Sequence, residues 1–339
     1  MSDRAIPNQV LLDFSNRKLL SPVPKNLYES ARAYFSKKEL DLLQTAYNVA
    51  FEAHKDQFRK EGSAYITHPV AVASILIELN LDIETVCAGL MHDVLEDSFI
   101  KKSYLEKLFG KDIVAIVDGV SNLNKLDFDS LEDRNANNLQ KMALAMSKDI
   151  RVIIVKLCDR LHNMRTIEFL PREKQIRKSI ETQELYGPIA IRIGMQNIRI
   201  ELEDLAFKCI HPMRARMLES AVQQTVGGRK RIISKLRKQF KYHLKNNDIT
   251  ATVKGRQKSL SSIYTKIKNK KKPFSEILDV YAFRVIVNSV DDVYRALGII
   301  HNIHKPIGNR FKDYIAIPKT NGYQALHTSL IALDGVPIE

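Results

Sequence analysis

The chain has 339 residues, 45% of them hydrophobic and 27% charged, a length that allows two domains, each with its own buried core. No apolar run approaches the roughly 20 residues that span a bilayer, and no basic start leads into an apolar block, so we expect a cytoplasmic protein without a membrane span or leader. Cys87, Cys158 and Cys209 are far apart and form no CxxC pair, so we expect buried thiols.

Basic charge is concentrated in one segment of the chain. The formal net charge is +14, yet residues 227–272 hold 16 Lys or Arg against the single acid Asp248, a net of +15. The rest of the chain therefore sums to about −1. This segment is either a solvated helix face with a lysine-rich loop or the contact for a phosphate-rich partner, a nucleotide or RNA.

In chain order, the first half reads as helices. Apolar residues recur at i, i+3, i+4 and i+7, separated by short polar joints, which is typical of amphipathic helices. We expect an all-helical domain over residues 1–196 and a helical linker over 197–226. The strongest helical segments are 39–58, 69–80, 83–97, 137–147 and 179–195.

The pattern changes after Gly227 and Gly228, where one more basic helix is followed by short runs rich in Val, Ile, Thr and aromatic residues. Helical stretches at 259–270 and 290–304 alternate with these runs, so residues 227–339 predict a mixed α/β domain built on a sheet. The expected strands are 250–255, 282–288, 313–318 and 325–333.

The stretch "LMHDVLEDS" places four ionisable groups, His92, Asp93, Glu96 and Asp97, in an otherwise apolar predicted helix. In a helix, residues four apart are neighbours, so the three carboxylates repel one another unless a cation lies among them. Imidazole with carboxylate is a ligand set for a divalent transition metal. A lone HD dipeptide is weak support for such a site.

Two further residues strengthen the hypothesis of a metal site. His68 lies in "YITHPVAVASIL" at the start of the preceding helix, just before a proline suited to a first turn. Asp159 lies in "VIIVKLCDRLHNMRT", where an apolar helix turns abruptly polar. Either residue alone is better explained as a core residue with satisfied hydrogen bonds, but H, HD and D in this order are typical of HD phosphohydrolases.

Longer motifs resemble one family. "FRKEGSAYITHPVAVASILIELNLDIETVCAGLMHDVLEDS", "MSKDIRVIIVKLCDRLHNMRT", "VKGRQKSLSSIYTKI", "ILDVYAFRVIVN" and "GNRFKDYIAIPKTNGYQALHTSL" are similar to the catalytic half of long RelA/SpoT-type stringent factors, which make and degrade ppGpp and pppGpp. The similarity covers residues 28–339, and "DVYAFRVIVN" is nearest to the SpoT branch. The expected fold is an all-α HD phosphohydrolase domain followed by a nucleotidyltransferase-like α/β synthetase domain.

The resemblance implies a Mn²⁺ site that hydrolyses the 3′-pyrophosphate of ppGpp or pppGpp, giving GDP or GTP and pyrophosphate. Glu96 and Asp97 would act on the attacking water. The implied metal ligands are His68, His92, Asp93 and Asp159, and the implied substrate contacts are Arg59, Lys60, Asn163 and Thr166.

In the second half the resemblance implies a synthetase-like site that would move pyrophosphate from ATP to GDP or GTP with Mg²⁺. Lysines and serine would hold phosphates, Asp279 the Mg²⁺, and Tyr323 the acceptor guanine, with His327 nearby. Glu339 would assist metal binding and activation of the acceptor hydroxyl. The full set is Arg256, Lys258, Ser262, Lys266, Asp279, Tyr323, His327 and Glu339.

Departures from the family pattern leave the four implied metal ligands, Glu96 and Asp97 intact, so the doubt that they raise falls mainly on synthesis. Ser259 stands where "GRPKH" or "GREKH" carries a histidine, and Asn137, Gln140 and Ile191 replace an acid, an arginine and a polar residue. We therefore expect a dominant hydrolase with a weak or inactive synthetase, the alternative being a bifunctional enzyme. The sequence also stops before the family's "QIRT" motif, so we expect a catalytic fragment without the C-terminal regulatory domains.

Two other classes of protein stay open. One is an HD enzyme that acts on deoxynucleotides or cyclic nucleotides. The other is an RNA-binding protein with an inert HD fold, and contact with RNA or the ribosome would use the basic segment.

Overall fold

The computed structural model describes residues 21–124, 144, 148–227, 230–270, 281–320, 322–331 and 337–339, without the side chains of 124, 224–231, 256, 257, 270 and 281. The chain divides into two compact units, residues 1–170 and 171–339. Each unit is described by itself.

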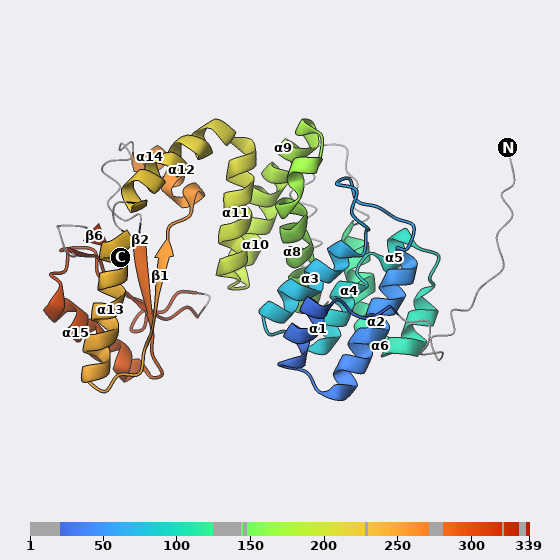
Figure 1. Cartoon of the computed structure of the whole chain (residues 1–339), viewed down its shortest axis with the longest axis horizontal. Helices are drawn as coiled ribbons and strands as arrows, with labels where there is room; N and C mark the ends of the chain where they lie inside the picture. The colour runs from blue at the N-terminus through green and yellow to red at the C-terminus, as the bar shows by residue number, and fades with distance from the viewer. Residues whose placement is uncertain are drawn as a thin grey trace, which may run out of the picture. The chain divides into compact units, whose positions relative to one another are not determined.

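The described part of the first unit is helical, as predicted (Figure 1). Its core is made by fully buried Leu43, Leu76, Leu90, Ile116 and Leu157, one from each of five packed helices. The helices are α1 (Lys25–Arg32), α2 (Lys37–Ala53), α3 (Thr67–Glu78), α4 (Ile83–Leu90), α5 (Val94–Asp97), α6 (Lys102–Asn124) and α8 (Ile150–Arg165), followed by the 3₁₀ turn η2 (Ile167–Phe169).

Helices α3 and α4 approach closely because α4 carries Gly89 at their contact. A Cβ atom at this position would collide with the buried Leu76 side chain of α3. The close contact matters for the candidate site, because the Gly89 carbonyl oxygen accepts a hydrogen bond of 2.8 Å from His92 Nδ1.

The predicted helix over 83–97 is wrong in one respect, since it is broken. Helix α4 ends at Leu90, residues 91–93 form a turn, and α5 begins at Val94. The His92 ring donates to a main-chain carbonyl three residues earlier, an alternative to the regular helical ladder. The break places His92 and Asp93 between two helices instead of on one helix face.

The second unit begins with helices that the sequence placed in the first domain and in the linker. Residues 172–196 group with unit 2 by their packing, and α11 packs against α9, α10, α12 and α14. The predicted domain limits at 196 and 226 stay predictions. The elements are α9 (Arg172–Glu181), the π-helix η3 (Thr182–Tyr186), α10 (Gly187–Arg192), α11 (Gln196–Ile210) and α12 (Pro212–Gly227).

The rest of this unit mixes helices with short strands, as predicted, but the described strands form three two-stranded antiparallel sheets instead of one. In the longest pair Thr252 lies opposite Ile286 and Gln257 opposite Tyr281. A core around Phe240 and Leu330 joins α13 to α15 and the strands. The elements are α13 (Lys230–Asn246), β1 (Thr252–Gln257), α14 (Leu260–Lys270), β2 (Tyr281–Ile286), α15 (Val290–Ile303), β3 (Lys312–Asp313), β4 (Leu326–His327), β5 (Leu330–Ile331) and β6 (Pro337–Ile338).

The strand predicted over 313–318 is also wrong, because a turn follows Asp313. Its carboxylate oxygen Oδ1 accepts hydrogen bonds from the backbone N–H of Ile315 at 2.9 Å and of Ala316 at 2.8 Å. Asp side chains that bind the backbone two or three residues ahead favour turns over strands. The helix predicted over 137–147 lies almost entirely outside the described residues.

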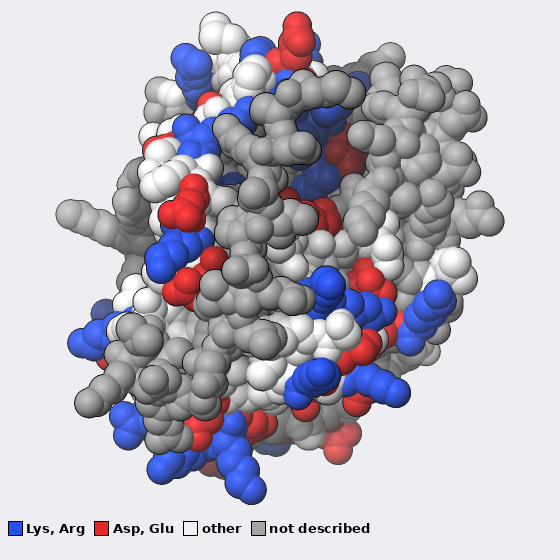
Figure 2. Space-filling model, turned by 90° about the vertical axis from the view of Figure 1, so that its right-hand side faces the viewer, with Lys and Arg blue, Asp and Glu red and all other residues white. Residues whose placement is uncertain are grey.

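The three cysteines are free and buried, as predicted. Burial raises the pKa of the Cys87 and Cys158 thiols. No described helix combines the length and apolar character that a membrane span requires. On the face that Figure 2 shows, Lys and Arg side chains are interspersed with Asp and Glu side chains.

Candidate metal centre and nucleotide sites

Four predicted ligands converge in the first unit, although they come from three parts of the chain. His68 lies in the first turn of α3, His92 and Asp93 lie in the turn between α4 and α5, and Asp159 lies in α8. His68 Nε2 is 3.1 Å from Asp159 Oδ1, and His92 Nε2 is 3.1 Å from Asp93 Oδ2. One donor atom each of His68, His92 and Asp159 lies within 4.8 Å of the other two. All four residues are buried.

The donor atoms fit a divalent cation. His92 Nδ1 donates to the Gly89 carbonyl, which leaves Nε2 as the ring nitrogen that faces the carboxylates. That nitrogen is buried and makes no hydrogen bond to any residue that the structure describes. Buried polar atoms are nearly always paired with a donor, an acceptor or an ion. Two imidazole nitrogens and two carboxylates form a set that suits Mn²⁺ and other first-row divalent metals.

The charged groups of this cluster lie close enough to shift one another's pKa values. Burial opposes the charge of His92, but Asp93 and Asp159 raise its pKa to about 9. Burial lowers the pKa of His68, against the effect of Asp159. Burial also opposes ionisation of Asp159, yet Lys156 and the histidines hold its pKa well below the usual range. A cation held by these residues would therefore displace a proton from His92.

Three residues that the sequence analysis missed hold the ligands in place. Tyr65 Oη donates to Asp93 Oδ2 at 2.8 Å, and Lys156 Nζ lies 2.6 Å from Asp159 Oδ2. His162 Nδ1 lies 2.8 Å from His68 Nδ1. Such outer partners orient metal ligands and set the tautomer of a ligating histidine.

Spacing could have found two of these partners. Lys156 and His162 flank Asp159 by three residues each in α8, whereas Tyr65 lies before the first residue of α3. Residues three apart lie on one helix face, so a polar residue at such a spacing from a ligand is a candidate partner. Burial lowers the pKa of His162 to about 4, with His68 and Arg59 adding to the shift. A neutral His162 can accept a hydrogen bond at Nδ1 from the Nδ1–H of His68.

The predicted catalytic acids lie in α5, directly after the ligand turn. The backbone N–H groups of Glu96 and Asp97 both donate to the Asp93 carbonyl oxygen. Glu96 is half-buried, whereas Asp97 is exposed. Partial burial and the Asp93 carboxylate raise the pKa of Asp97. The structure thus places both acids within one turn of the cluster.

Three of the four predicted substrate contacts lie together beside the cluster. Arg59 Nη2 donates to Asn163 Oδ1 at 3.2 Å and to Thr166 Oγ1 at 3.1 Å. Asn163 Nδ2 in turn donates to Asp159 Oδ1, which connects this group to a predicted metal ligand. Lys60, the fourth, is exposed.

A short hairpin positions Arg59. Arg59 N donates to the Ser63 carbonyl at 2.8 Å, Tyr65 N donates to the Gln57 carbonyl at 2.9 Å, and Phe58 and Ala64 form a bridge. Gly62 makes the turn with φ +84°, a conformation that glycine adopts without strain. The hairpin brings Arg59 next to the end of α8.

The second unit assembles part of the synthetase-like set. Glu339 Oε2 lies 2.9 Å from Lys258 Nζ, and Glu339 Oε1 lies 3.5 Å from His327 Nδ1. Tyr323 Oη lies 3.0 Å from His327 Nε2. The hydrogen bond with His327 leads the effects that lower the pKa of Glu339 to about 2; burial opposes the shift, and Lys258 and Lys266 add to it.

The other members of that set are less informative. Ser262 Oγ accepts a hydrogen bond of 2.8 Å from Ser259 Oγ, so the serine that replaces the family's histidine contacts the next predicted residue. The Arg256 side chain and all of Asp279 lie outside the described part of the chain.

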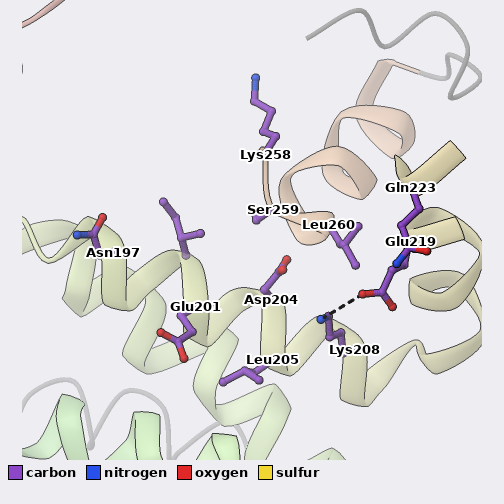
Figure 3. A pocket seen from close by; sticks show the side chains of 11 residues that line it. Asn197, Glu201, Asp204, Leu205, Lys208, Glu219, Gln223, Lys258, Ser259 and Leu260 are labelled. Carbon is purple, nitrogen blue, oxygen red and sulfur yellow. Dashed lines mark ion pairs between the residues drawn. The ribbon is translucent and has the colours of Figure 1, made fainter. Parts of the chain in front are cut away.

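A cavity of about 540 Å³ in the second unit lies beside Lys258 and is lined by α11, α12 and the start of α14 (Figure 3). Carboxylates of Glu201, Asp204 and Glu219 line it, and Lys208 pairs with Glu219 at 3.8 Å. Asp204 Oδ1 accepts from Ser261 N at 2.8 Å and so caps the start of α14. None of the four predicted metal ligands lines this cavity.

Comparisons with known proteins match both halves. A family described as "HD domain" matches residues 46–196, and one described as "Region found in RelA / SpoT proteins" matches residues 255–339. A guanosine-3′,5′-bis(diphosphate) 3′-pyrophosphohydrolase of Vibrio cholerae is 46% identical over 93% of this chain and 44% of that protein.

Two further relatives differ in their named activities. The bifunctional (p)ppGpp synthase/hydrolase SpoT of Escherichia coli K12 is 47% identical over 93% of this chain and 45% of that protein. A GTP pyrophosphokinase of Streptomyces antibioticus is 42% identical over 100% of this chain and 40% of that protein. The chain therefore spans less than half the length of these relatives. With an HD domain followed by a RelA/SpoT region, the chain belongs to the RelA/SpoT family.

Proposed function

We propose that the chain hydrolyses the 3′-pyrophosphate of ppGpp or pppGpp in a Mn²⁺-dependent reaction that gives GDP or GTP and pyrophosphate, in the cytoplasm. The observation that carries the proposal is the buried cluster of His68, His92 and Asp159, with His92 Nε2 facing carboxylates and making no described hydrogen bond. The choice of substrate rests on the named activities of the relatives from Vibrio cholerae and Escherichia coli.

In this proposal His68, His92, Asp93 and Asp159 hold the ion. The bound ion lowers the pKa of a water molecule and offsets negative charge on the phosphate. Mn²⁺ is the ion that the resemblance to the RelA/SpoT family implies, and two imidazoles with two carboxylates are compatible with it as with other first-row divalent metals. Tyr65, Lys156 and His162 keep the four ligands oriented through the contacts described above.

Glu96 and Asp97 orient the water and accept its proton. A general base works best when its pKa lies near the working pH, and the raised pKa of Asp97 moves that carboxyl in this direction. The Asp93 carboxylate is itself held by Tyr65 and His92.

Arg59 stacks on and binds the guanine, Asn163 and Thr166 line the nucleotide pocket, and Lys60 contacts phosphate. A planar guanidinium suits stacking on a base. The mutual contacts of Arg59, Asn163 and Thr166 support the proposal. Asn163 bonds both Arg59 and Asp159, so one side chain joins the proposed guanine contact to a proposed metal ligand.

Product chromatography tests this function. The purified chain is incubated with ppGpp and Mn²⁺, beside His92→Ala and Asp93→Ala variants. Conversion to GDP and pyrophosphate that both variants lose would support the proposal. Intact Mn²⁺ binding without hydrolysis would refute it, and turnover of deoxynucleotides or cyclic nucleotides alone would favour another HD enzyme.

For the second unit we propose a weak or inactive synthetase, the alternative being a bifunctional enzyme. Ser259 in place of the family's histidine favours the weak form, whereas the grouping of Lys258, Tyr323, His327 and Glu339 favours retention of nucleotide binding. Incubation with ATP, GDP and Mg²⁺ distinguishes the two, because alarmone formed at a rate comparable to hydrolysis would establish the bifunctional enzyme.

The exposed face of α13 supports a proposed RNA contact. Leu236, Phe240 and Leu244 bury one face of this helix, and Tyr242 is 63% exposed on another. Binding through phosphates weakens with salt, so log affinity for single-stranded RNA should fall by about 0.7 per log unit of salt for each phosphate neutralised. Unchanged RNA affinity in a Lys238→Glu, Lys241→Glu double variant would refute the contact. Among the described side chains of α13, the exposed cations are Lys235, Arg237, Lys238, Lys241 and Lys245.

A further inference from the structure

His54 is a buried histidine outside both the metal ligands and the nucleotide contacts. It is the residue that follows α2, with only 1% of its surface exposed. His54 Nδ1 lies 2.8 Å from Gln57 Oε1, and Gln57 Nε2 donates a hydrogen bond of 2.8 Å to the Asp97 carbonyl oxygen, 40 residues away. The pair therefore connects the end of α2 to the end of α5.

The direction of these hydrogen bonds follows from the donors. The Gln57 amide NH₂ donates to the carbonyl of Asp97, so its Oε1 faces His54 and accepts from Nδ1–H. The Gln57 backbone carbonyl also accepts from Tyr65 N at 2.9 Å. Both the main chain and the side chain of Gln57 are thus held in place.

The other contact of His54 leads to a metal ligand. Its ring packs against the Tyr65 ring with centroids 4.6 Å apart and planes 30° apart. Tyr65 Oη donates to Asp93 Oδ2 at 2.8 Å. His54 accordingly supports Asp93 through Tyr65 and Asp97 through Gln57. Asp93 directly precedes α5, the helix that carries the proposed catalytic acids, and Asp97 is its last residue.

Helix α5 needs such support. It has four residues, and a helix this short is not stable on its own. The last carbonyl groups of a helix accept no hydrogen bond within it, and Gln57 Nε2 donates one to the carbonyl of Asp97.

We propose that His54 and Gln57 are positioning residues that hold α5, and with it Glu96 and Asp97, against the metal cluster. The inference rests on the proposed hydrolase function for its kinetic consequence. Its structural part, the anchoring of α5, does not depend on the substrate.

Two Gln57 variants separate donation from space filling. Gln57→Ala removes the side chain, whereas Gln57→Glu keeps its size but cannot donate to the Asp97 carbonyl when ionised. We expect both to lower kcat for ppGpp at least tenfold, with KM and Mn²⁺ affinity within threefold of the unchanged chain. His54→Ala should lower kcat in the same way.

Gln44→Ala is the matched control. Gln44 is also in α2, and its Nε2 donates to the Ser21 carbonyl at 2.9 Å and lies 3.0 Å from Asn48 Oδ1. Its removal costs comparable side-chain hydrogen bonds without contact to α5. We expect kcat of Gln44→Ala within twofold of the unchanged chain.

Hydrogen exchange of the peptide over residues 94–98 gives a readout without substrate. We expect exchange at least tenfold faster in Gln57→Ala and Gln57→Glu than in Gln44→Ala. Equal exchange in all three variants would overturn the positioning role, even if ppGpp proved not to be the substrate. Faster exchange in the two Gln57 variants, together with no ppGpp hydrolysis by the unchanged chain, would refute the proposed hydrolase and still support the anchoring of α5.

Discussion

Replacing Lys156 by Met tests how the cluster balances its charge without metal. Lys156 Nζ lies 2.6 Å from Asp159 Oδ2, and the side chains are only 11% and 6% exposed. Met has a similar volume but no charge, so Asp159 loses its cationic partner in a buried place. Removing one partner of a buried ion pair costs about 3–5 kcal/mol in the free energy of unfolding.

The cost should depend on the metal. At about 2–4 °C per kcal/mol for a unit of this size, the metal-free variant should unfold roughly 10 °C below the unchanged chain. Mn²⁺ restores a cation beside Asp159, so the variant should bind Mn²⁺ about tenfold more tightly, or 1.4 kcal/mol. The difference in unfolding temperature should then narrow at saturating Mn²⁺.

Thermal unfolding by circular dichroism, with EDTA and with Mn²⁺, measures both effects. Lys102→Met is the control, because Lys102 pairs with Asp118 at 2.9 Å on the surface and its loss should cost less than about 1 kcal/mol. An equal loss of unfolding temperature for Lys156→Met with and without Mn²⁺ would show that Lys156 is not coupled to the metal site.

Three further predictions concern other parts of the molecule. Because carboxylates raise the pKa of His92 to about 9, Mn²⁺ affinity measured by calorimetry should fall about tenfold per pH unit below pH 9. In the chain without metal, the stability that the His92 proton adds is complete below pH 6.5 and should be lost as the pH rises through 9. Gly89→Ala should cost about 1–3 kcal/mol in thermal unfolding by crowding Leu76. Phe240→Ala should lower the free energy of unfolding of the second unit by about 3–5 kcal/mol and leave Mn²⁺ affinity unchanged. Mn²⁺ binding that does not depend on pH would contradict the first prediction, and unchanged unfolding of Gly89→Ala the second. Altered Mn²⁺ affinity of Phe240→Ala would contradict the third.

The grouping of the four predicted ligands could be predicted from sequence because their residue types are rare in apolar helices. His68, His92, Asp93 and Asp159 each interrupt a hydrophobic pattern, and burial of such groups requires a partner. The path of the chain around them could not be predicted in the same way. A ring-to-backbone hydrogen bond from His92 to Gly89 is a local competitor of the helix that periodicity does not register.

The partners of the ligands were harder to predict than the ligands. Tyr65 reads as an ordinary loop position, and only the hairpin over 57–65 brings Tyr65 to Asp93 and Gln57 to the Asp97 carbonyl. The turn after Asp313 was missed for another reason, because the alternating apolar residues of 313–318 resemble a strand, whereas the Asp313 side chain binds the backbone ahead of it. Side-chain to backbone hydrogen bonds thus decided the turns at His92 and at Asp313.

The most direct test measures Mn²⁺ binding and ppGpp hydrolysis in the same samples of the unchanged chain and of Asp159→Asn. Hydrolysis that rises in proportion to one bound Mn²⁺ per chain, and that Asp159→Asn loses together with the ion, is the predicted result. Hydrolysis that persists in Asp159→Asn, or that needs no bound metal, would contradict the assignment of the buried cluster as the catalytic centre.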